Sequence, residues 1–478
     1  MWRSLRWAFA AAAIAVAAFA LGGAASSVSR LPDLQPWHHL VTALELRAAE
    51  IGSTATLDEY LQREDAVFRE VRERVEAPVT AGADPVIPNR YVTGSRSHWS
   101  RLGKDWNRTQ ILDTPEPRGG ALLVHGLTDS PYSMRALADR LNARGYYTLS
   151  LRMQGHGTVP GGLVGPEWED WLAAVKLGAR HVRSRVGEAR PLVLVGYSNG
   201  GALLTKYALD AVEDGALPKP SRVVLVSPMI GVSPLARLAR AISLLGPVVE
   251  KARWLDVYPE YNPFKYTSFP ANAGLQTFRL TRAMREQITR LGDAGRLREL
   301  PPVLAFQSVV DTTVSTPAVV YDLFDRLPEG GGHELVLFDI NRQAVIDAMT
   351  KPGAVLPRLL GDGPRAYAVT LVTNAGPGTA EVSAMTAAPN APALAAESLA
   401  VRWPPEIFSL SHIALPFPPD DPVNGGEPPE GTETVRLGRL APRGEKDVLI
   451  VPLDSLMRVS WNPFFGYLAD RIDRAIDR

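Results

Sequence analysis

A serine lies between two glycines in the stretch LVLVGYSNGGALL, residues 192–204. Gly196, Ser198 and Gly200 fit the pattern G-x-S-x-G where an apolar run gives way to a helical pattern. A sharp turn from strand to helix strains its apex residue and brings backbone segments close together, so side chains at both glycine positions would obstruct it. Ser198 would then be exposed at a helix N-terminus, where amide groups favour negative charge, as a nucleophile requires. A glycine-rich turn with a capping serine is the alternative.

A serine hydroxyl becomes a nucleophile when a base, itself oriented by a third group, takes its proton. The order expected for a serine on such a turn is serine, acid, histidine, and only His333 and His412 follow Ser198 among the 8 histidines. His333 begins a predicted strand, at the wrong end of a parallel sheet for catalysis. We therefore predict His412 as the base, with a solvated loop histidine as the alternative. Asp311 follows the predicted strand 303–306 and is the predicted acid, with a turn or capping role as its alternative.

Acyl transfer also requires hydrogen-bond donors for the developing oxyanion. The backbone amide of Asn199, directly after the serine, can supply one donor, and the loop after His125 and Gly126 can supply another. We assign that second donor to the amide of Leu127. Apolar packing is the alternative role for this leucine.

Alternating strand and helix patterns would position these residues. Apolar strands are predicted at 119–125, 146–151, 191–195, 222–226 and 303–306, with helices between them near 130–145, 167–186 and 199–211. Strands buried on both faces and separated by helices predict a mostly parallel sheet covered by helices on both sides. Sites in such sheets form beyond the carboxyl ends of the strands.

Several segments together resemble a known family. LLVHGLTDSPYSMRALADRLNARGY, LRMQGHGT, WEDWLAAV, GYSNGG, SVVDTTVS and SHIALPF are similar to the α/β-hydrolase superfamily, closest to its serine carboxylesterase and monoacylglycerol-lipase-like members. The resemblance covers about residues 119–417. It implies an α/β-hydrolase fold, a triad of Ser198, Asp311 and His412, and an oxyanion hole formed by the amides of Leu127 and Asn199.

The resemblance also implies scaffold roles. His156, in the turn GHG, is expected to support the site, and Trp168 and Trp171 are expected to pack in the body. His38 and His39 are adjacent and face different directions, so we expect loop or packing roles for them rather than metal binding.

The remaining segments set the expected domain organisation. The final helix is expected to bury Phe464, Phe465, Leu468 and Ile472 on one face, while Asp420 and Asp421 are expected to be solvated turn acids, with cation binding as the alternative. A charged amphipathic helix at 57–75 suggests a surface extension. The expected divisions are an N-terminal extension (31–118), a hydrolase core (119–228 and 301–340), a cap (229–300), an insertion (341–403) and a histidine loop with the C-terminal helix (404–478).

Two of these divisions bear on the site. The cap carries aromatic side chains that either line an apolar pocket for an acyl or aryl group or pack the cap onto the body: Trp254, Tyr258, Tyr261, Phe264, Tyr266 and Phe269. The insertion pushes His412 unusually far from Asp311. We expect it to be an excursion that returns to the rim of the site.

The N-terminus and the composition limit the partners. Arg3 and Arg6 precede an apolar run ending near Ala25, which predicts an export signal or an uncleaved membrane anchor over residues 1–30, with a buried alanine-rich helix as the alternative. Either prediction places the body outside the cytoplasm: periplasmic, secreted or anchored. The chain has no cysteine, which excludes disulfides and thiolate chemistry, and equal numbers of basic and acidic residues (51 each) give no net field toward nucleic acid.

The sequence therefore predicts a serine hydrolase that cleaves carboxylic esters through an acyl-enzyme. The expected substrate is a small-molecule or lipid ester, and the mechanism requires no metal or organic cofactor. An amidase, thioesterase or peptidase with the same triad is one alternative, because the fold does not fix the substrate. A membrane-tethered binding module without turnover is the other.

Overall fold

The computed structural model describes most of the chain. Its residues are 29–231, 249–311, 313–342, 364–376, 378–391, 394–405, 407–439 and 458–477. The predicted export signal or anchor lies almost entirely outside the described residues. Within those ranges, no helix combines the length and apolar character that crossing a bilayer requires.

A ten-stranded sheet forms the centre of the molecule. Its order is β1-β3-β2-β4-β5-β8-β9-β10-β11-β12. The strands are β1 (Gln110–Leu112), β2 (Gly119–Val124), β3 (Tyr146–Leu151), β4 (Leu192–Tyr197), β5 (Arg222–Val226), β8 (Val303–Ser308), β9 (Glu334–Phe338), β10 (Ala368–Asn374), β11 (Glu381–Ala387) and β12 (Leu394–Arg402). The strands from β3 to β10 in that order pair in parallel, whereas β1, β11 and β12 pair antiparallel to their neighbours. The predicted mostly parallel sheet is confirmed.

Helices cover both faces of this sheet because its strands are apolar on both sides. On one face, alternate strand residues such as Leu122 and Leu194 pack with α7 (Trp168–Val186), α8 (Asn199–Glu213) and α10 (Ala271–Asp293). On the other face, their neighbours, such as Leu123 and Val195, pack with α6 (Arg135–Ala143) and α13 (Phe465–Ile476). The expected cap range thus contains a long helix, α10, whose buried side belongs to the main core.

The segment before the core, which we predicted to be a surface extension, has an exposed face and also packs onto the core through buried side chains. In α4 (Leu57–Val71) the tyrosine Tyr60 is 2% exposed and its hydroxyl donates to the carbonyl of Arg152 at 2.7 Å. The fully buried Arg152 guanidinium pairs with Glu45 at 2.9 Å and with Glu64 at 3.0 Å. A buried cation requires such partners, and this segment supplies both.

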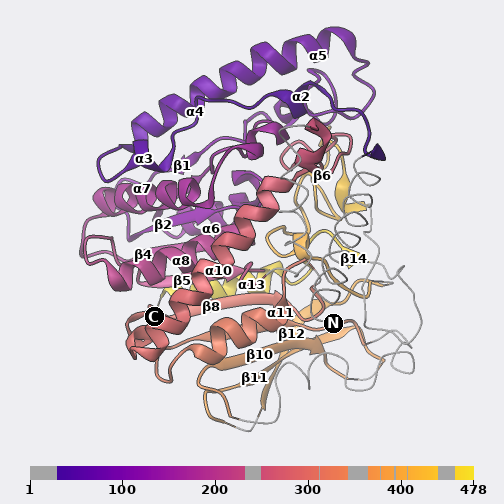
Figure 1. Cartoon of the computed structure of the whole chain (residues 1–478). Helices are drawn as coiled ribbons and strands as arrows, with labels where there is room; N and C mark the ends of the chain where they lie inside the picture. Colours follow the sequence, from indigo (N-terminus) through magenta and orange to yellow (C-terminus); the bar gives the residue numbers. More distant parts are fainter. Residues whose placement is uncertain are drawn as a thin grey trace, which may run out of the picture.

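The insertion extends the sheet at its far edge. Figure 1 shows β10, β11 and β12 at the opposite end of the molecule from α4 and α5 (Ala77–Gly82). The C-terminal helix docks as predicted, since Phe464, Leu468 and Ile472 are each at most 2% exposed. Its acidic face pairs with α6 through Arg140, which contacts Asp473 at 2.7 Å.

Candidate active site

Ser198 occupies a strained turn between β4 and α8. Its backbone has φ 53° and ψ −116°, a conformation that non-glycine residues rarely adopt. The backbone is held from both sides: its N–H donates to Val226 at 3.0 Å and its carbonyl accepts from Met229 at 3.0 Å. The turn therefore presents the serine hydroxyl at the N-terminus of α8.

Two glycines make this turn possible. A Cβ atom at Gly200 would lie 2.1 Å from the carbonyl oxygen of Val124, and one at Gly196 would lie 2.7 Å from the backbone of Gly200 and Gly201. Contacts this short with backbone are not relieved by a change of rotamer. The steric reason given for the glycines in the sequence pattern is thus present in the structure.

The structure brings the three predicted triad residues together. The Nε2 atom of His412 lies 3.0 Å from the hydroxyl of Ser198, and its Nδ1 atom lies 2.9 Å from the carboxylate of Asp311. A carboxylate accepts, so the imidazole proton belongs on Nδ1, which leaves Nε2 to accept from the serine. The ring of His412 also stacks on Tyr197, with centroids 5.4 Å apart.

The carboxylate of Asp311 is fixed by further hydrogen bonds. One oxygen accepts from the amides of Thr313 (2.9 Å) and Val314 (3.1 Å), and the other accepts from the side-chain amide of Gln307 at 3.0 Å as well as from His412. The Asp311 side chain is fully buried. Gln307 was not predicted. It lies near the end of β8, four residues before Asp311, and this position could have indicated that it contacts the carboxylate.

The long excursion before His412 returns to the point where it leaves. The amide of Asn341, just after β9, donates to the carbonyl of Phe408 at 2.7 Å, and its side chain donates to Ile407 at 2.9 Å. A short parallel bridge between β13 (Ser409–Leu410) and β14 (Arg458–Val459) follows. The distance along the chain between Asp311 and His412 therefore imposes no separation in space.

Two backbone amides are available near Ser198. Neither the amide of Leu127 nor that of Asn199 has a hydrogen-bond acceptor among the described residues. Asn199 is the first residue of α8, where helical amides lack intrahelical partners. Gly126 approaches Ser198 so closely that a Cβ at position 126 would lie 3.2 Å from the Ser198 Cβ.

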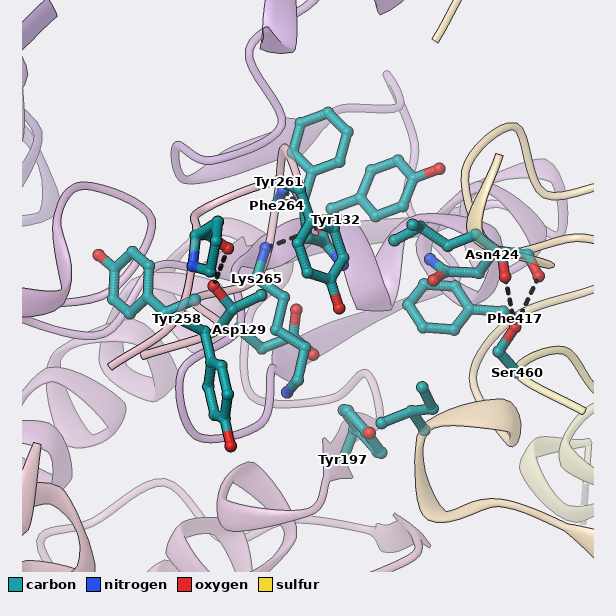
Figure 2. A pocket seen from close by; sticks show the side chains of 16 residues that line it. Asp129, Tyr132, Tyr197, Tyr258, Tyr261, Phe264, Lys265, Phe417, Asn424 and Ser460 are labelled. Atoms are coloured by element: carbon teal, nitrogen blue, oxygen red, sulfur yellow. Dashed lines mark hydrogen bonds between the residues drawn. The ribbon is translucent and has the colours of Figure 1, made fainter. Parts of the chain in front are cut away.

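A cavity of about 610 Å³ adjoins the triad. It is largely aromatic, and Figure 2 shows Tyr258 at one end with Asn424 and Ser460 at the other. Tyr197 and Ile413, the neighbours of Ser198 and His412 in sequence, lie in its wall. Of the six cap aromatics, four line the cavity (Tyr258, Tyr261, Phe264 and Tyr266), whereas Trp254 is buried beside His38 and Phe269 packs against the core.

Two charged side chains also line this cavity. Burial raises the pKa of Asp129, and the nearby Lys265 ammonium opposes that rise. The lysine also donates to the carbonyl of Leu127 at 3.4 Å. Sequence reasoning missed both residues, because Asp129 and Lys265 lie 136 positions apart in the chain.

Four other histidines, His38, His39, His156 and His333, make their contacts outside the triad. His333 accepts from the amide of Val303 at 3.1 Å, and burial lowers its pKa to about 4. His38 contacts the hydroxyl of Ser268, His39 pairs with Glu250 at the surface, and His156 is buried. Across the described ranges, no group of three or more histidine and acidic side chains could hold a metal ion.

The expectation for Asp420 and Asp421 is half wrong. Asp420 is exposed, but Asp421 is 1% exposed and accepts from the hydroxyl of Tyr132 at 2.8 Å and from Arg135 at 3.2 Å. This aspartate joins the loop after His412 to the start of α6. It acts as an anchor because its charge is satisfied by buried partners.

Comparison with known proteins bears on the fold. The family described as serine aminopeptidase S33 (Hydrolase_4) matches residues 115–328. That range contains β2, β3, β4, β5 and β8, the strained serine turn and Asp311, but not His412. The chain has an α/β-hydrolase fold.

The chain is similar to lipases and esterases in sequence and fold. It is 28% identical over 174 residues to a thermostable monoacylglycerol lipase of Bacillus sp. (strain H-257). The matched region covers 36% of this chain and 65% of that relative, so the chain spans less than two thirds of its length. Among solved structures, the metagenome-derived lipolytic enzymes LipS and LipT match with 22% identity and a TM-score of 0.38, covering 48% of this chain and 87% of the other. Monoacylglycerol lipase of Paleococcus ferrophilus matches with 20% identity and a TM-score of 0.37, covering 48% and 88%.

Proposed function

We propose that this α/β-hydrolase cleaves carboxylic esters through an acyl-enzyme. The observation that carries the proposal is the hydrogen-bonded row from Asp311 through His412 to Ser198, with distances of 2.9 and 3.0 Å. His412 takes the proton of Ser198 as the serine oxygen attacks the ester carbonyl, and Asp311 stabilises the imidazolium that forms. The histidine then gives that proton to the leaving alcohol. Water attacks the acyl-enzyme by the same route and releases the acid.

The amides of Leu127 and Asn199 are the proposed donors to the oxyanion. Both lie on backbone that approaches Ser198, and neither has another acceptor among the described residues. Fixed donors of this kind stabilise charge that develops in the transition state, which raises the rate rather than the affinity for substrate.

The cavity supports an ester with an apolar acyl or aryl group. The rings of Tyr132 and Phe264 stack with centroids 4.0 Å apart, and Phe417 lies beside them in the same wall. Similarity to a monoacylglycerol lipase also favours a lipid ester. Membrane association through the N-terminal segment, and a location outside the cytoplasm, remain part of the proposal and derive from the sequence.

The test is hydrolysis of p-nitrophenyl esters, from acetate to palmitate, by the full chain in detergent. We expect turnover that falls about 1,000-fold or more in Ser198→Ala and His412→Ala. Ser184→Ala and His39→Ala are matched controls, because both side chains are exposed and their contacts, with His181 and Glu250, are with residues outside the triad. A folded chain that cleaves no ester and does not react with a fluorophosphonate would reject the proposal in favour of a binding module.

A peptidase is the second candidate, favoured by the description of the matching family as a serine aminopeptidase. The same triad can cleave amides. Aminoacyl p-nitroanilides with a free amino group distinguish the two activities. Turnover of these substrates at a higher kcat/KM than that of any ester would replace the esterase proposal.

A further inference from the structure

The peptide that joins Gly126 to Leu127 has an anchored carbonyl. Its oxygen accepts from the Nδ1 atom of His125 at 2.8 Å and from the amide of Asp129 at 3.3 Å. The bond is trans, since the structure describes no cis peptide, so the N–H of Leu127 points away from this oxygen. Fixing the carbonyl therefore fixes the direction of the proposed oxyanion donor.

The hydrogen bonds of His125 determine its tautomer. The amide of Met153 donates to Nε2 at 3.1 Å, so Nε2 must carry a lone pair and the proton must lie on Nδ1. Nδ1 is then a donor, as its contact with the carbonyl of Gly126 requires. One ring thus joins the end of β3 to the loop that carries the oxyanion donor.

Burial keeps this ring neutral. His125 is 1% exposed, and burial lowers its pKa to about 3, with Arg152 and Lys265 acting in the same direction and the bond to Gly126 opposing them. The ring of His156 packs against it with centroids 4.9 Å apart. The tautomer therefore persists throughout the pH range in which a histidine base could work.

We infer that His125 is a positioning residue for the oxyanion hole, which aims the N–H of Leu127 at the substrate carbonyl oxygen through the peptide it anchors. His125 itself touches no substrate atom in this arrangement. Its contribution is to the transition state of both acylation and deacylation, since the same oxyanion forms in each step. This inference rests on the proposed ester hydrolysis.

Two substitutions separate positioning from simple packing. His125→Asn keeps a donor at the position of Nδ1 but loses the acceptor for Met153, whereas His125→Gln keeps an acceptor at the position of Nε2 but loses the donor to Gly126. A buried amide without a partner destabilises the fold, so His125→Asn should be the less stable variant. A purely structural role would make activity follow that stability.

We expect the opposite order for the rate. In His125→Gln, kcat on p-nitrophenyl esters should fall roughly 10- to 100-fold with KM within about twofold, whereas His125→Asn should stay within about threefold of the wild type below its melting temperature. A larger loss of kcat in His125→Asn than in His125→Gln, or a change confined to KM, would overturn the inference.

A measurement on the unmodified chain tests the same point without a variant. Long-range proton–nitrogen NMR of histidine-labelled protein should show His125 protonated on Nδ1 alone and unchanged between pH 5 and 9. A proton on Nε2 of His125, or titration of its ring within that range, would overturn the inferred positioning role and leave the proposed function untouched. A wild-type chain that cleaves no ester rejects the proposed function instead, so the two failures are distinguishable.

Discussion

Gly200 is the residue at which the active-site turn tolerates least change. A Cβ atom at this position would lie 2.1 Å from the carbonyl oxygen of Val124 and 2.6 Å from that of His125. Val124 ends strand β2 and His125 follows it, so both obstructing atoms are backbone atoms. The clash can therefore be removed only if the turn moves away from the strand. Such a movement would also displace Ser198.

We therefore predict that Gly200→Ala lowers the free energy of unfolding by about 3 kcal/mol and removes esterase activity. Urea unfolding and p-nitrophenyl ester hydrolysis measure the two effects. Gly466→Ala is the matched control, because a Cβ at this exposed position in α13 meets no atom within 4 Å. Alanine there should be neutral or stabilising by up to about 1 kcal/mol. Equal effects at the two glycines would contradict the steric account.

The sequence allowed the positions of Ser198, Asp311 and His412 to be predicted because each follows a local pattern. A nucleophile turn, an acid past a strand end and a histidine after the last core strand are all visible along the chain. Gln307 and the partners of Arg152 were not predicted. Their roles come from contacts between segments, and a glutamine or glutamate on an amphipathic pattern looks the same whether its partner is water or a buried cation.

Asp421 connects two elements that the sequence separates by almost 290 residues. It accepts from Tyr132 in the short helix Pro131–Met134, from Arg135 at the start of α6, and from two amides of its own loop. The ring of Tyr132 in turn forms part of the aromatic cavity wall. This aspartate therefore fixes the loop after His412 and the wall of the pocket together.

We predict that Asp421→Ala destabilises the protein by about 3 kcal/mol, because it leaves the Tyr132 hydroxyl and two amides without their acceptor and removes the nearer of the two carboxylates that pair with Arg135. Thermal and urea unfolding measure the loss. The adjacent Asp420→Ala changes the same residue type at an exposed position and should shift stability by less than about 0.5 kcal/mol. If both variants behave alike, the buried contacts of Asp421 contribute nothing to stability.

At the scale of the whole molecule, buried histidines make stability depend on acid. His333 has a folded pKa of about 4, below its ordinary value of 6.5, because burial disfavours the charged ring. The unfolded chain therefore binds a proton that the folded chain does not between these values. This contribution is fully present above pH 6.5 and is lost as pH falls toward 4.

The variant His333→Asn should reduce that acid sensitivity. Asparagine can accept from the amide of Val303 in place of Nδ1 but does not titrate. Between pH 7.5 and pH 5 the wild type should lose about 2 kcal/mol more stability than the variant, on the basis of 1.36 kcal/mol for each unit of pKa difference. Urea unfolding at both pH values measures this difference. Parallel losses in the two proteins would show that His333 carries no such linkage.

The parallel core of the fold was predictable from the sequence. The packing of the segment before β1 and the antiparallel strands β11 and β12 were not predicted. Apolar runs with helical stretches between them indicate a parallel sheet, and β2, β3, β4, β5 and β8 lie close to their predicted positions. The antiparallel strands β11 and β12 are mostly exposed or half-buried, and the segment before β1 packs through scattered residues. Neither produces a continuous apolar run along the sequence.

The hydrogen bond between Asn341 and Phe408 has a consequence for how such a chain can change over evolution. It closes the entrance and exit of a 66-residue detour upon one another, so the chain reaches His412 from a fixed point. We expect changes of length in the outer part of that detour to leave the position of His412 unaltered as long as the closure, and the contact of Asn374 with Asn341 that supports it, persist. The junction is therefore a natural point for grafting a foreign module onto the enzyme.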